Sequence, residues 1–230
     1  MAVMTKRWKL SPAALKLYLD CPRCFWLKYR AGIKRPTDGL FPKLPGSLDV
    51  LIKRRFDEHR ERGSMPPELR ELDGYTLFPQ KEKLAVWRDY REGIVWEDEE
   101  GNVLMGAVDD LLVRDGRLAV LDYKTRGDGN GGVYNTYKLQ LEVYHFLLEK
   151  NGYDVEDTAY ILFFWPTASN HGHVVFETRL ETVKLDTSRV EPLYREAISV
   201  LKRETPPPSS PSCVFCGWTK RVMRFFLEET

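Results

Sequence analysis

Apolar positions in this chain keep a helical spacing over roughly the first 62 residues and a strand-like spacing over much of the remaining sequence. Ser11 before Pro12 predicts the start of a short helix, because serine caps free amide groups and proline fits the first turn. Ser47 predicts the N-cap of a second helix, which runs to about Arg62. One face of this helix is expected to carry Leu48, Leu51, Ile52, Arg55, Phe56 and His59.

Strands are predicted from residue 74 onwards, because short apolar or alternating runs are separated there by turn residues. The runs are "GYTLF", "GIVWED", "NVLMGAVDDLLV", "LAVLDYKT", "TAYILFFWP" and "HVVFETRLE". A helix from about Thr136 to Lys150 separates the fourth run from the fifth. A later amphipathic helix carries Val190, Leu193, Tyr194, Ala197, Ile198 and Leu201 on one face. The pattern predicts an α/β fold, with a mixed central sheet flanked by helices.

The dipeptide Asp115-Gly116 between two apolar runs predicts a tight β-hairpin. This turn fixes the register, with Leu111 opposite Val120 and Asp109 opposite Asp122. Two carboxylates then lie side by side, with Cβ atoms roughly 5 Å apart. Such a pair destabilises a sheet unless a cation neutralises it, and Mg²⁺ or Mn²⁺ prefers these oxygen ligands.

Lys124 lies two residues beyond Asp122 and is expected on the same face of the sheet. Two carboxylates and one ammonium group form a grouping suited to phosphodiester hydrolysis. The alternative is a structural ion-pair cluster at the end of the sheet. Asp110, adjacent to Asp109, also leaves the choice of the first ligand open.

Composition sets the class of protein. The chain has 230 residues, 43% hydrophobic and 30% charged, and this predicts a single globular domain. Its formal net charge of +1 gives no global basic field for nucleic acid. We find no apolar stretch of membrane-spanning length and no signal peptide. We therefore expect a cytoplasmic protein with reduced thiols and no membrane partner.

In "GAVD", "LDYKT" and "QLEVY" the chain resembles the PD-(D/E)XK nuclease superfamily, in particular its RecB-like exonucleases. The resemblance implies a restriction-endonuclease-like core in which Asp109, Asp122 and the carbonyl of Tyr123 hold the metal ion. It implies that Lys124 positions the attacking water or stabilises the developing phosphorane charge. It also implies a site role for Gln140 and Tyr144, which share one face of the following helix.

The family usually has a histidine ligand on the upstream helix, shortly after a glycine. Here Gly46 is followed by Ser47, Leu48, Asp49 and Val50, so that histidine is missing. Asp49 is the first candidate for its replacement, and Glu58 and His59 are the others.

The four cysteines form two pairs, Cys21-x-x-Cys24 and Cys213-x-x-Cys216. Together they predict one metal centre with four thiolates, whereas a redox-active pair or free buried thiols are the alternatives. The proline-rich segment "TPPPSSPS" directly precedes the second pair and is expected to act as a semi-rigid linker. We expect residues 11–35 and 205–230 to form a metal-centre subdomain around the nuclease core.

Spacing alone favours Zn²⁺ at these cysteines. The segment "YLDCPRCFWLKY", however, resembles the N-terminal cysteine segment of the CRISPR-associated RecB-like exonucleases, which implies a [4Fe–4S] cluster. Those proteins usually divide their cysteines one and three, and this chain divides them two and two. On the resemblance we expect a [4Fe–4S] cluster, with Zn²⁺ as the alternative.

Clusters of basic and aromatic residues suit single-stranded DNA. The basic residues are Lys28, Arg30, Lys34, Arg35, Lys53 to Arg55, Lys220, Arg221 and Arg224, and the aromatic ones are Trp26, Tyr29, Tyr134, Tyr137 and Trp218. The Gly-rich stretch "TRGDGNGGVYNT" is either a mobile rim or a long connector.

We expect a metal-dependent DNA exonuclease that acts on single strands. The resemblance implies partners in DNA repair, recombination or CRISPR adaptation. A nucleic-acid-binding module that does not cut, or a Cys₄ scaffold protein, is the alternative.

Overall fold

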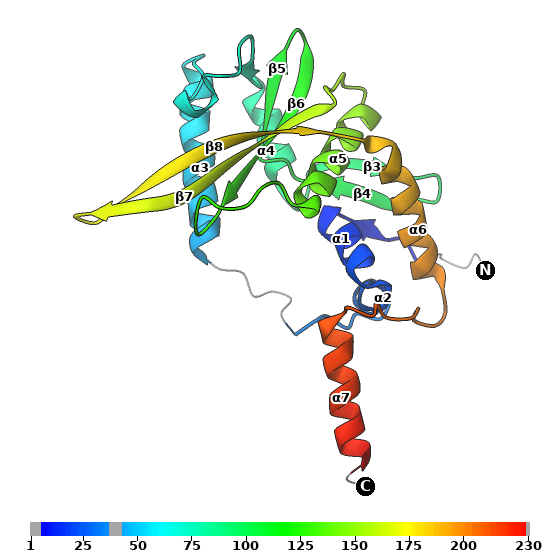
Figure 1. Cartoon of the computed structure of the whole chain (residues 1–230). Helices are drawn as coiled ribbons and strands as arrows, with labels where there is room; N and C mark the ends of the chain where they lie inside the picture. The colour runs from blue at the N-terminus through cyan, green and yellow to red at the C-terminus, as the bar shows by residue number, and fades with distance from the viewer. Residues whose placement is uncertain (1–5, 37–42, 229–230) are drawn as a thin grey trace.

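The computed structural model describes residues 6–36 and 43–228, and its largest layer is a five-stranded mixed sheet (Figure 1). The strand order is β2-β5-β6-β7-β8, and only β6 and β7 run parallel. The bounds are β2 Thr76–Leu77, β5 Asp110–Arg114, β6 Arg117–Thr125, β7 Thr158–Asn170 and β8 His173–Lys184. Strands β7 and β8 form a long hairpin that extends beyond the rest of the sheet.

A three-stranded sheet lies beside it, in the order β1-β4-β3. Its strands are β1 Lys9–Leu10, β4 Val103–Gly106 and β3 Ile94–Glu97. The single strand expected over "NVLMGAVDDLLV" is therefore wrong, because β4 and β5 belong to different sheets. The chain leaves one sheet at Gly106 and enters the other at Asp110, so Asp109 lies in the gap between them.

Helices cover both faces of the larger sheet. Helix α3 (Lys43–Glu61) packs on one face, where Phe56 is fully buried among the side chains of β5, β6 and β7. Helix α5 (Asn135–Lys150) packs on the other face and contributes much of the main core. The predicted α/β class, with mixed sheets flanked by helices, is confirmed.

The two predicted helix starts have different outcomes. Helix α1 (Pro12–Asp20) begins as expected, and its cap Ser11 accepts a hydrogen bond of 3.3 Å from the Ala14 amide. The cap assigned to Ser47 is wrong, because α3 already includes Lys43. Pro45 is tolerated there, since the first turn does not need its missing amide.

Several helices were not expected from the apolar pattern. They are α2 (Pro22–Tyr29), α4 (Lys81–Arg88), two short 3₁₀ turns at Pro67–Leu69 and Thr187–Arg189, and the C-terminal α7 (Val214–Glu228). The expected amphipathic helix is α6 (Val190–Lys202). No helix in the described part of the chain is long and apolar enough to span a bilayer.

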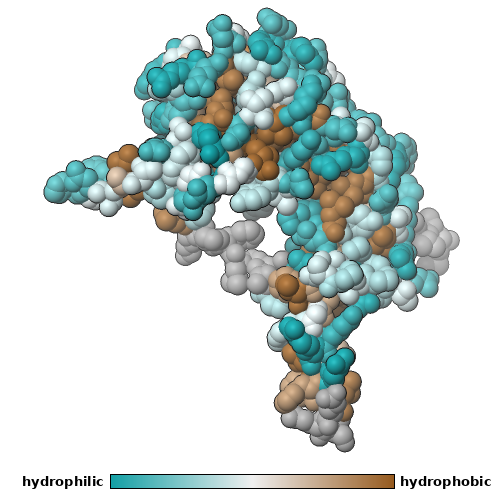
Figure 2. Space-filling view, in the orientation of Figure 1, coloured by the Kyte–Doolittle hydropathy of each residue, from teal (hydrophilic) through white to brown (hydrophobic). Residues whose placement is uncertain are grey.

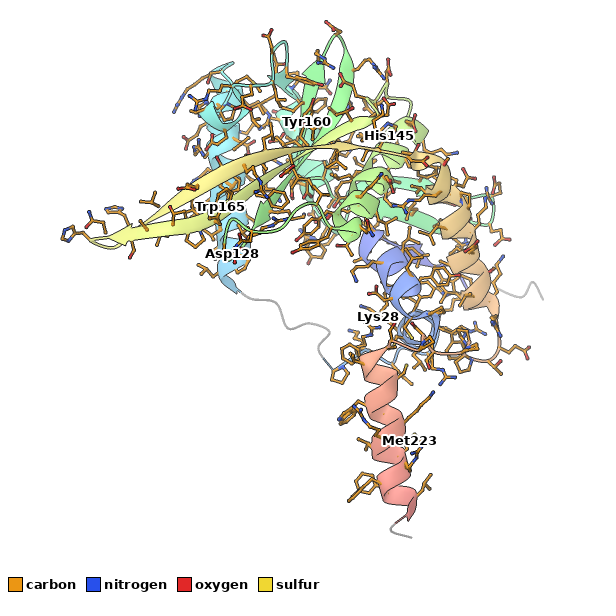
Figure 3. All side chains as sticks on the ribbon, viewed as in Figure 1. Lys28, Asp128, His145, Tyr160, Trp165 and Met223 are labelled. Atoms are coloured by element: carbon orange, nitrogen blue, oxygen red, sulfur yellow. The ribbon has the colours of Figure 1, made fainter. Side chains whose placement is uncertain are left out.

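Helix α7 projects from the rest of the molecule (Figure 1). Apolar and polar residues alternate along its surface (Figure 2), and Met223 lies partway along it, away from the core (Figure 3). Trp218 and Phe225 are 57% and 59% exposed. The basic residues Lys220, Arg221 and Arg224 lie on this helix.

Candidate active site and cysteine centre

The β5–β6 hairpin has the predicted register. Arg114 pairs with Arg117 and Leu111 with Val120, and both turn residues have positive φ, 52° at Asp115 and 80° at Gly116. Strand β5 begins only at Asp110, so β6 continues past it from Asp122 to Thr125 with an open edge. Asp109 therefore does not form the predicted ladder pair with Asp122, but its carboxylate reaches this edge, where it accepts a hydrogen bond from the Tyr123 amide and lies close enough to Asp122 for the two charges to repel.

Asp122 is the more deeply buried of the two aspartates, with 1% of its side chain exposed. It forms an ion pair with Lys124, and its Oδ1 has no hydrogen-bond partner among the described residues. Burial, together with repulsion from Asp109, raises the Asp122 pKa to about 7. A buried carboxylate with a free oxygen atom is suited to accept a cation.

Asp109 lies in a more polar environment. One carboxylate oxygen lies 2.8 Å from Lys53 Nζ, and the other accepts a hydrogen bond of 3.0 Å from the Tyr123 amide. Burial opposes its ionisation, but Lys53 and Lys124 outweigh that effect and hold the Asp109 pKa below its usual value. The two neighbouring aspartates therefore have pKa values shifted in opposite directions.

Lys53 joins Asp49 to this group, since its Nζ lies 2.8 Å from an Asp49 oxygen as well. Glu58 pairs instead with Arg62 at 3.7 Å, and His59 Nδ1 lies 3.0 Å from Ser64 Oγ. Of the three upstream candidates, Asp49 is the one that this chain of contacts links to Asp109. The sequence suggested Lys53 only as a DNA contact, although its i,i+4 spacing from Asp49 signals a pair on one helix face.

Gln140 and Tyr144 lie one turn apart on α5, as predicted, and Gln140 Nε2 donates a 2.6 Å hydrogen bond to Tyr144 Oη. Tyr144 is 4% exposed, and burial together with the charges of Asp122 and Asp109 raises its pKa. Its ring packs against Gly106, where an added Cβ would come within 2.7 Å of ring carbons. Gly106 thus allows Tyr144 to approach the two aspartates.

A family model of the PD-(D/E)XK nuclease superfamily matches residues 43–221, the region that contains all of these side chains. The chain belongs to the PD-(D/E)XK nuclease superfamily. A solved structure described as "Crystal structure of SSO0001" is similar to this chain at 14% sequence identity and a TM-score of 0.45. The match covers 88% of this chain and 81% of that one.

PD-(D/E)XK nucleases use divalent metal ions, and the donor set here fits one. Asp122 Oδ1 lacks a partner among the described residues, and Asp109 lies at the same open edge. Within residues 6–36 and 43–228, however, no three acidic or histidine side chains bring their ligand atoms within 4.8 Å of one another. The ammonium groups of Lys53 and Lys124 form ion pairs with these carboxylates.

Asp110, the neighbouring aspartate, has a different environment in this PD-(D/E)XK chain. It is fully buried on the α3 side, paired with Arg60 and Arg88, and it accepts a 2.7 Å hydrogen bond from Tyr123 Oη. Arg88 also donates a 2.6 Å hydrogen bond to the Asp109 carbonyl. The apolar pattern gave no sign of this network, because α4, which carries Arg88, was not predicted.

The Gly-rich loop after β6 is held by two arginines. Arg126 donates to the carbonyls of Asn130 and Gly131, and Arg179 of β8 donates to those of Gly129 and Gly131. Gly129 also packs against Trp165, beside Asp128 (Figure 3). These contacts support a tethered rim over the end of β6.

The four cysteines meet as predicted, at the junction of α1, α2 and α7. Their sulfur atoms all lie within 4.8 Å of one another, with Cys24 3.6 Å from both Cys213 and Cys216, and Cys21 3.9 Å from Cys216. Three of the residues are buried, and none forms a disulfide. The arrangement fits a bound metal, because four converging thiols supply a complete ligand set.

The pKa values of the cysteine thiols are shifted in opposite directions: burial raises those of Cys24 and Cys216, whereas that of Cys213 is lowered. Burial opposes ionisation, but hydrogen bonds from the Cys216 backbone and the neighbouring thiols lower the Cys213 pKa to about 7. Arg35 Nη2 lies 3.9 Å from Cys213 Sγ, and its guanidinium group lies over the Phe215 ring. A cation at this position partly offsets the negative charge of a thiolate cluster.

The raised Asp122 pKa predicts how stability depends on pH when no divalent cation is added. A folded-state pKa of about 7 exceeds the value of about 4 in an unfolded chain, so protonated Asp122 favours folding. This contribution is complete below about pH 4 and is lost as the pH rises through 7. We expect Asp122→Asn to match the wild type in urea midpoint at low pH and to exceed it increasingly up to pH 8. A constant difference between the two proteins across this range would contradict the prediction.

Proposed function

We propose that this chain is a metal-dependent DNA exonuclease that hydrolyses phosphodiester bonds in single strands. The observation that carries the proposal is the pair Asp109 and Asp122 at the open edge of β6, with Lys124 against Asp122. The opposite shifts of the two aspartate pKa values support the proposal, because perturbed pKa values cluster at functional sites.

Asp109, Asp122 and the Tyr123 carbonyl would hold Mg²⁺ or Mn²⁺, with Asp49 as a further ligand through water or directly. Such a cation, when bound, polarises the phosphate and makes a water molecule more acidic. Lys124 remains charged because, although burial opposes its charge, Asp122 and Asp109 raise its pKa. Its ammonium can therefore orient the attacking water or donate to a phosphate oxygen as negative charge develops.

Gln140 and Tyr144 supply neutral hydrogen-bond donors beside the carboxylates. Tyr144 stays protonated at neutral pH because its pKa is raised. Its hydroxyl and the Gln140 amide already bond to each other, so both are oriented before substrate arrives. We propose that they contact the phosphate that is cut.

Exposed aromatic and basic groups, some beside the aspartates and others on the projecting helix α7, support nucleic acid as substrate. Tyr134 on the Gly-rich rim is 56% exposed and packs against Tyr137, whose ring lies 5.4 Å from Lys124 Nζ. Trp218 is exposed on α7, beside Lys220 and Arg221. Trp26, by contrast, is wrong as a stacking residue, because it is buried and donates to the Arg203 carbonyl.

The cysteine centre is proposed to hold one Zn²⁺ ion. A tetrahedral Zn–S distance of about 2.3 Å places sulfur atoms about 3.8 Å apart. Three of the six sulfur pairs here are separated by 3.6–3.9 Å, and all four sulfur atoms lie within 4.8 Å of one another. The [4Fe–4S] cluster that the resemblance implied binds its thiolates to separate iron atoms, so it needs wider spacing. We propose that residues 11–35 and 205–230 form one subdomain around this ion, within a single nuclease domain.

Metal analysis of the purified chain tests this assignment. We expect one zinc per chain and a colourless protein. A brown protein with absorbance near ~400 nm and about four irons per chain would instead establish the iron–sulfur cluster.

The nuclease proposal is tested with end-labelled DNA in Mg²⁺, Mn²⁺ or EDTA. We expect a linear single strand to be shortened stepwise from one end, and a circular single strand of the same sequence to persist. Binding without any hydrolysis in either metal would favour a module that does not cut. Rapid cleavage of the circle would establish an endonuclease instead.

Lys124→Ala is expected to keep Mn²⁺ binding but to slow hydrolysis about a hundredfold or more, because the ammonium acts on the reacting groups and is not a ligand. Titration calorimetry and single-turnover cleavage separate the two effects. Lys184→Ala is the matched control, since Lys184 is also a strand lysine paired with an aspartate, Asp157. Complete loss of Mn²⁺ binding in a folded Lys124→Ala protein would contradict the assigned role.

A further inference from the structure

A groove lies between the N-terminal half of α3 and the β7–β8 hairpin, which crosses this helix in Figure 1. Its volume is about 290 Å³. The apolar walls come from Leu48, Leu51 and Ile52 on one side and from Phe164 and Phe176 on the other. Leu51 is 48% exposed, so part of this apolar surface faces solvent.

The groove adjoins the aspartates along the open edge of β6. Thr125 lines the groove and directly follows Lys124, but successive strand residues point to opposite faces. Ile52, on the opposite wall, directly precedes Lys53. A chain that crosses the open edge beside Asp109 can therefore place one group at the aspartates and the next in the groove.

Polar groups in the groove are few and placed at its margins. The hydroxyl groups of Thr125 and Thr178 line it, and neither has a hydrogen-bond partner in the described part of the chain. Arg55 stands at the rim, held by Glu68 at 2.6 Å. An apolar slot with two unpaired hydroxyls and a planar cation at its mouth suits a flat aromatic ring with a polar edge.

We propose that this groove binds one unpaired nucleobase of the substrate, next to the phosphodiester group at Asp109 and Asp122. The inference rests on the proposed nuclease function and specifies its substrate. A base that enters the α3 side of the sheet while its phosphate stays at the edge has to leave any duplex. The groove therefore gives a physical reason for selecting single strands or frayed ends.

Phe176 is the residue through which the proposal is tested, because it is only partly buried and has no place in the hydrolytic group. The probe is a labelled single-stranded oligonucleotide with one abasic site, moved stepwise along the strand, and affinity is measured by fluorescence anisotropy with Ca²⁺. Removing one stacked base weakens such binding about tenfold or more. We expect one position to show this loss in the wild type and no position to show it in Phe176→Ala.

Two further variants, one inside the groove and one outside it, test whether the effect of Phe176→Ala is specific to the groove. Leu51→Asp changes a half-exposed residue, so it should fold normally and also abolish the positional effect. Val174→Ala, near the tip of the same hairpin and 55% exposed, should retain it. Affinities within twofold at every abasic position, or an equal positional loss in Phe176→Ala and Leu51→Asp, would overturn the proposal.

Cleavage of the same oligonucleotides in Mn²⁺ separates this inference from the proposed function. Hydrolysis without a positional effect would contradict base binding in the groove but support the nuclease proposal. A positional effect without hydrolysis would contradict the nuclease proposal but support base binding in the groove. A wild-type chain that neither binds nor cuts the oligonucleotides would overturn both.

Discussion

Asp122→Asn is expected to lower the rate of phosphodiester hydrolysis about a thousandfold while the protein stays folded. A metal-ligating carboxylate supports several kcal/mol of transition-state stabilisation, and each 1.36 kcal/mol corresponds to a tenfold change in rate. The amide keeps the shape of the side chain, so packing around this buried position is preserved. Single-turnover cleavage in saturating Mn²⁺ measures the effect, and circular dichroism checks the fold.

Asp115→Asn is the matched control, because it makes the same chemical change at the turn of the same hairpin. Asp115 has a φ of 52°, a conformation that asparagine adopts readily, and it lies away from the open edge. This variant should cleave like the wild type. If Asp122→Asn retains activity within tenfold of the wild type, Asp122 is not part of the catalytic site.

Asp109→Ala should also abolish cleavage, but its effect on stability should be the opposite. A charge on buried Asp122 is unfavourable at neutral pH, so removing it stabilises the fold. Asp109 instead forms an ion pair with Lys53 and accepts a hydrogen bond from the Tyr123 amide, so removing it destabilises the fold. The sequence offers no basis for separating the two, since the hairpin register predicts a symmetric pair. Lys53 and the Tyr123 amide create the difference, and Lys53 reaches the site from a helix distant in sequence.

Cys213→Ser is expected to destabilise the whole chain and not only its C-terminal end. A metal shared by Cys21 and Cys216 closes a loop across a sequence separation of 195 residues. If a disulfide is the guide, a link across so long a loop stabilises the fold by on the order of 4–5 kcal/mol. This is a large part of the total stability of an ordinary domain. Denaturant unfolding measures the loss, and limited proteolysis should cut both terminal segments.

Ser212→Ala, the neighbouring exposed residue, is the control for this variant and should behave like the wild type. The contrary result is a Cys213→Ser protein with an unchanged unfolding midpoint that is trimmed only after residue 205. That outcome would mean that the two cysteine pairs do not share one metal ion.

The parts of the fold that could be predicted are those in which local signals decide the structure. Asp115-Gly116 determines the hairpin, and with it the neighbouring positions of Asp109 and Asp122, because positive φ at both residues specifies the turn. Ser11 determines the start of α1 for the same kind of local reason. The two cysteine pairs indicated their meeting because four thiols with short spacings have few other uses.

The parts that could not be predicted depend on tertiary contacts. Nothing local divides "NVLMGAVDDLLV" into two sheets, and the groups at the break form tertiary contacts instead: the Val108 amide donates to the Trp87 carbonyl, and Arg88 donates to the Asp109 carbonyl. Helix α4 lies in a short, highly charged stretch, although Leu84 and Trp87 become buried and Arg88 reaches the Asp109 carbonyl. The groove beside the open edge is lined by residues from α3 and from β8. These elements are far apart in the sequence, so no single segment predicts the groove.

The two halves of the cysteine centre also appear at different times during synthesis. Cys216 follows Cys21 by 195 residues, so at about 5–20 residues per second the first pair waits roughly 10–40 s for the second. In that interval both sheets are translated and can form, while Cys21 and Cys24 remain an incomplete binding site open to oxidants. Insertion of the proposed metal ion would therefore be a late step of maturation, and slower translation would lengthen the period in which the first cysteine pair is exposed to oxidants.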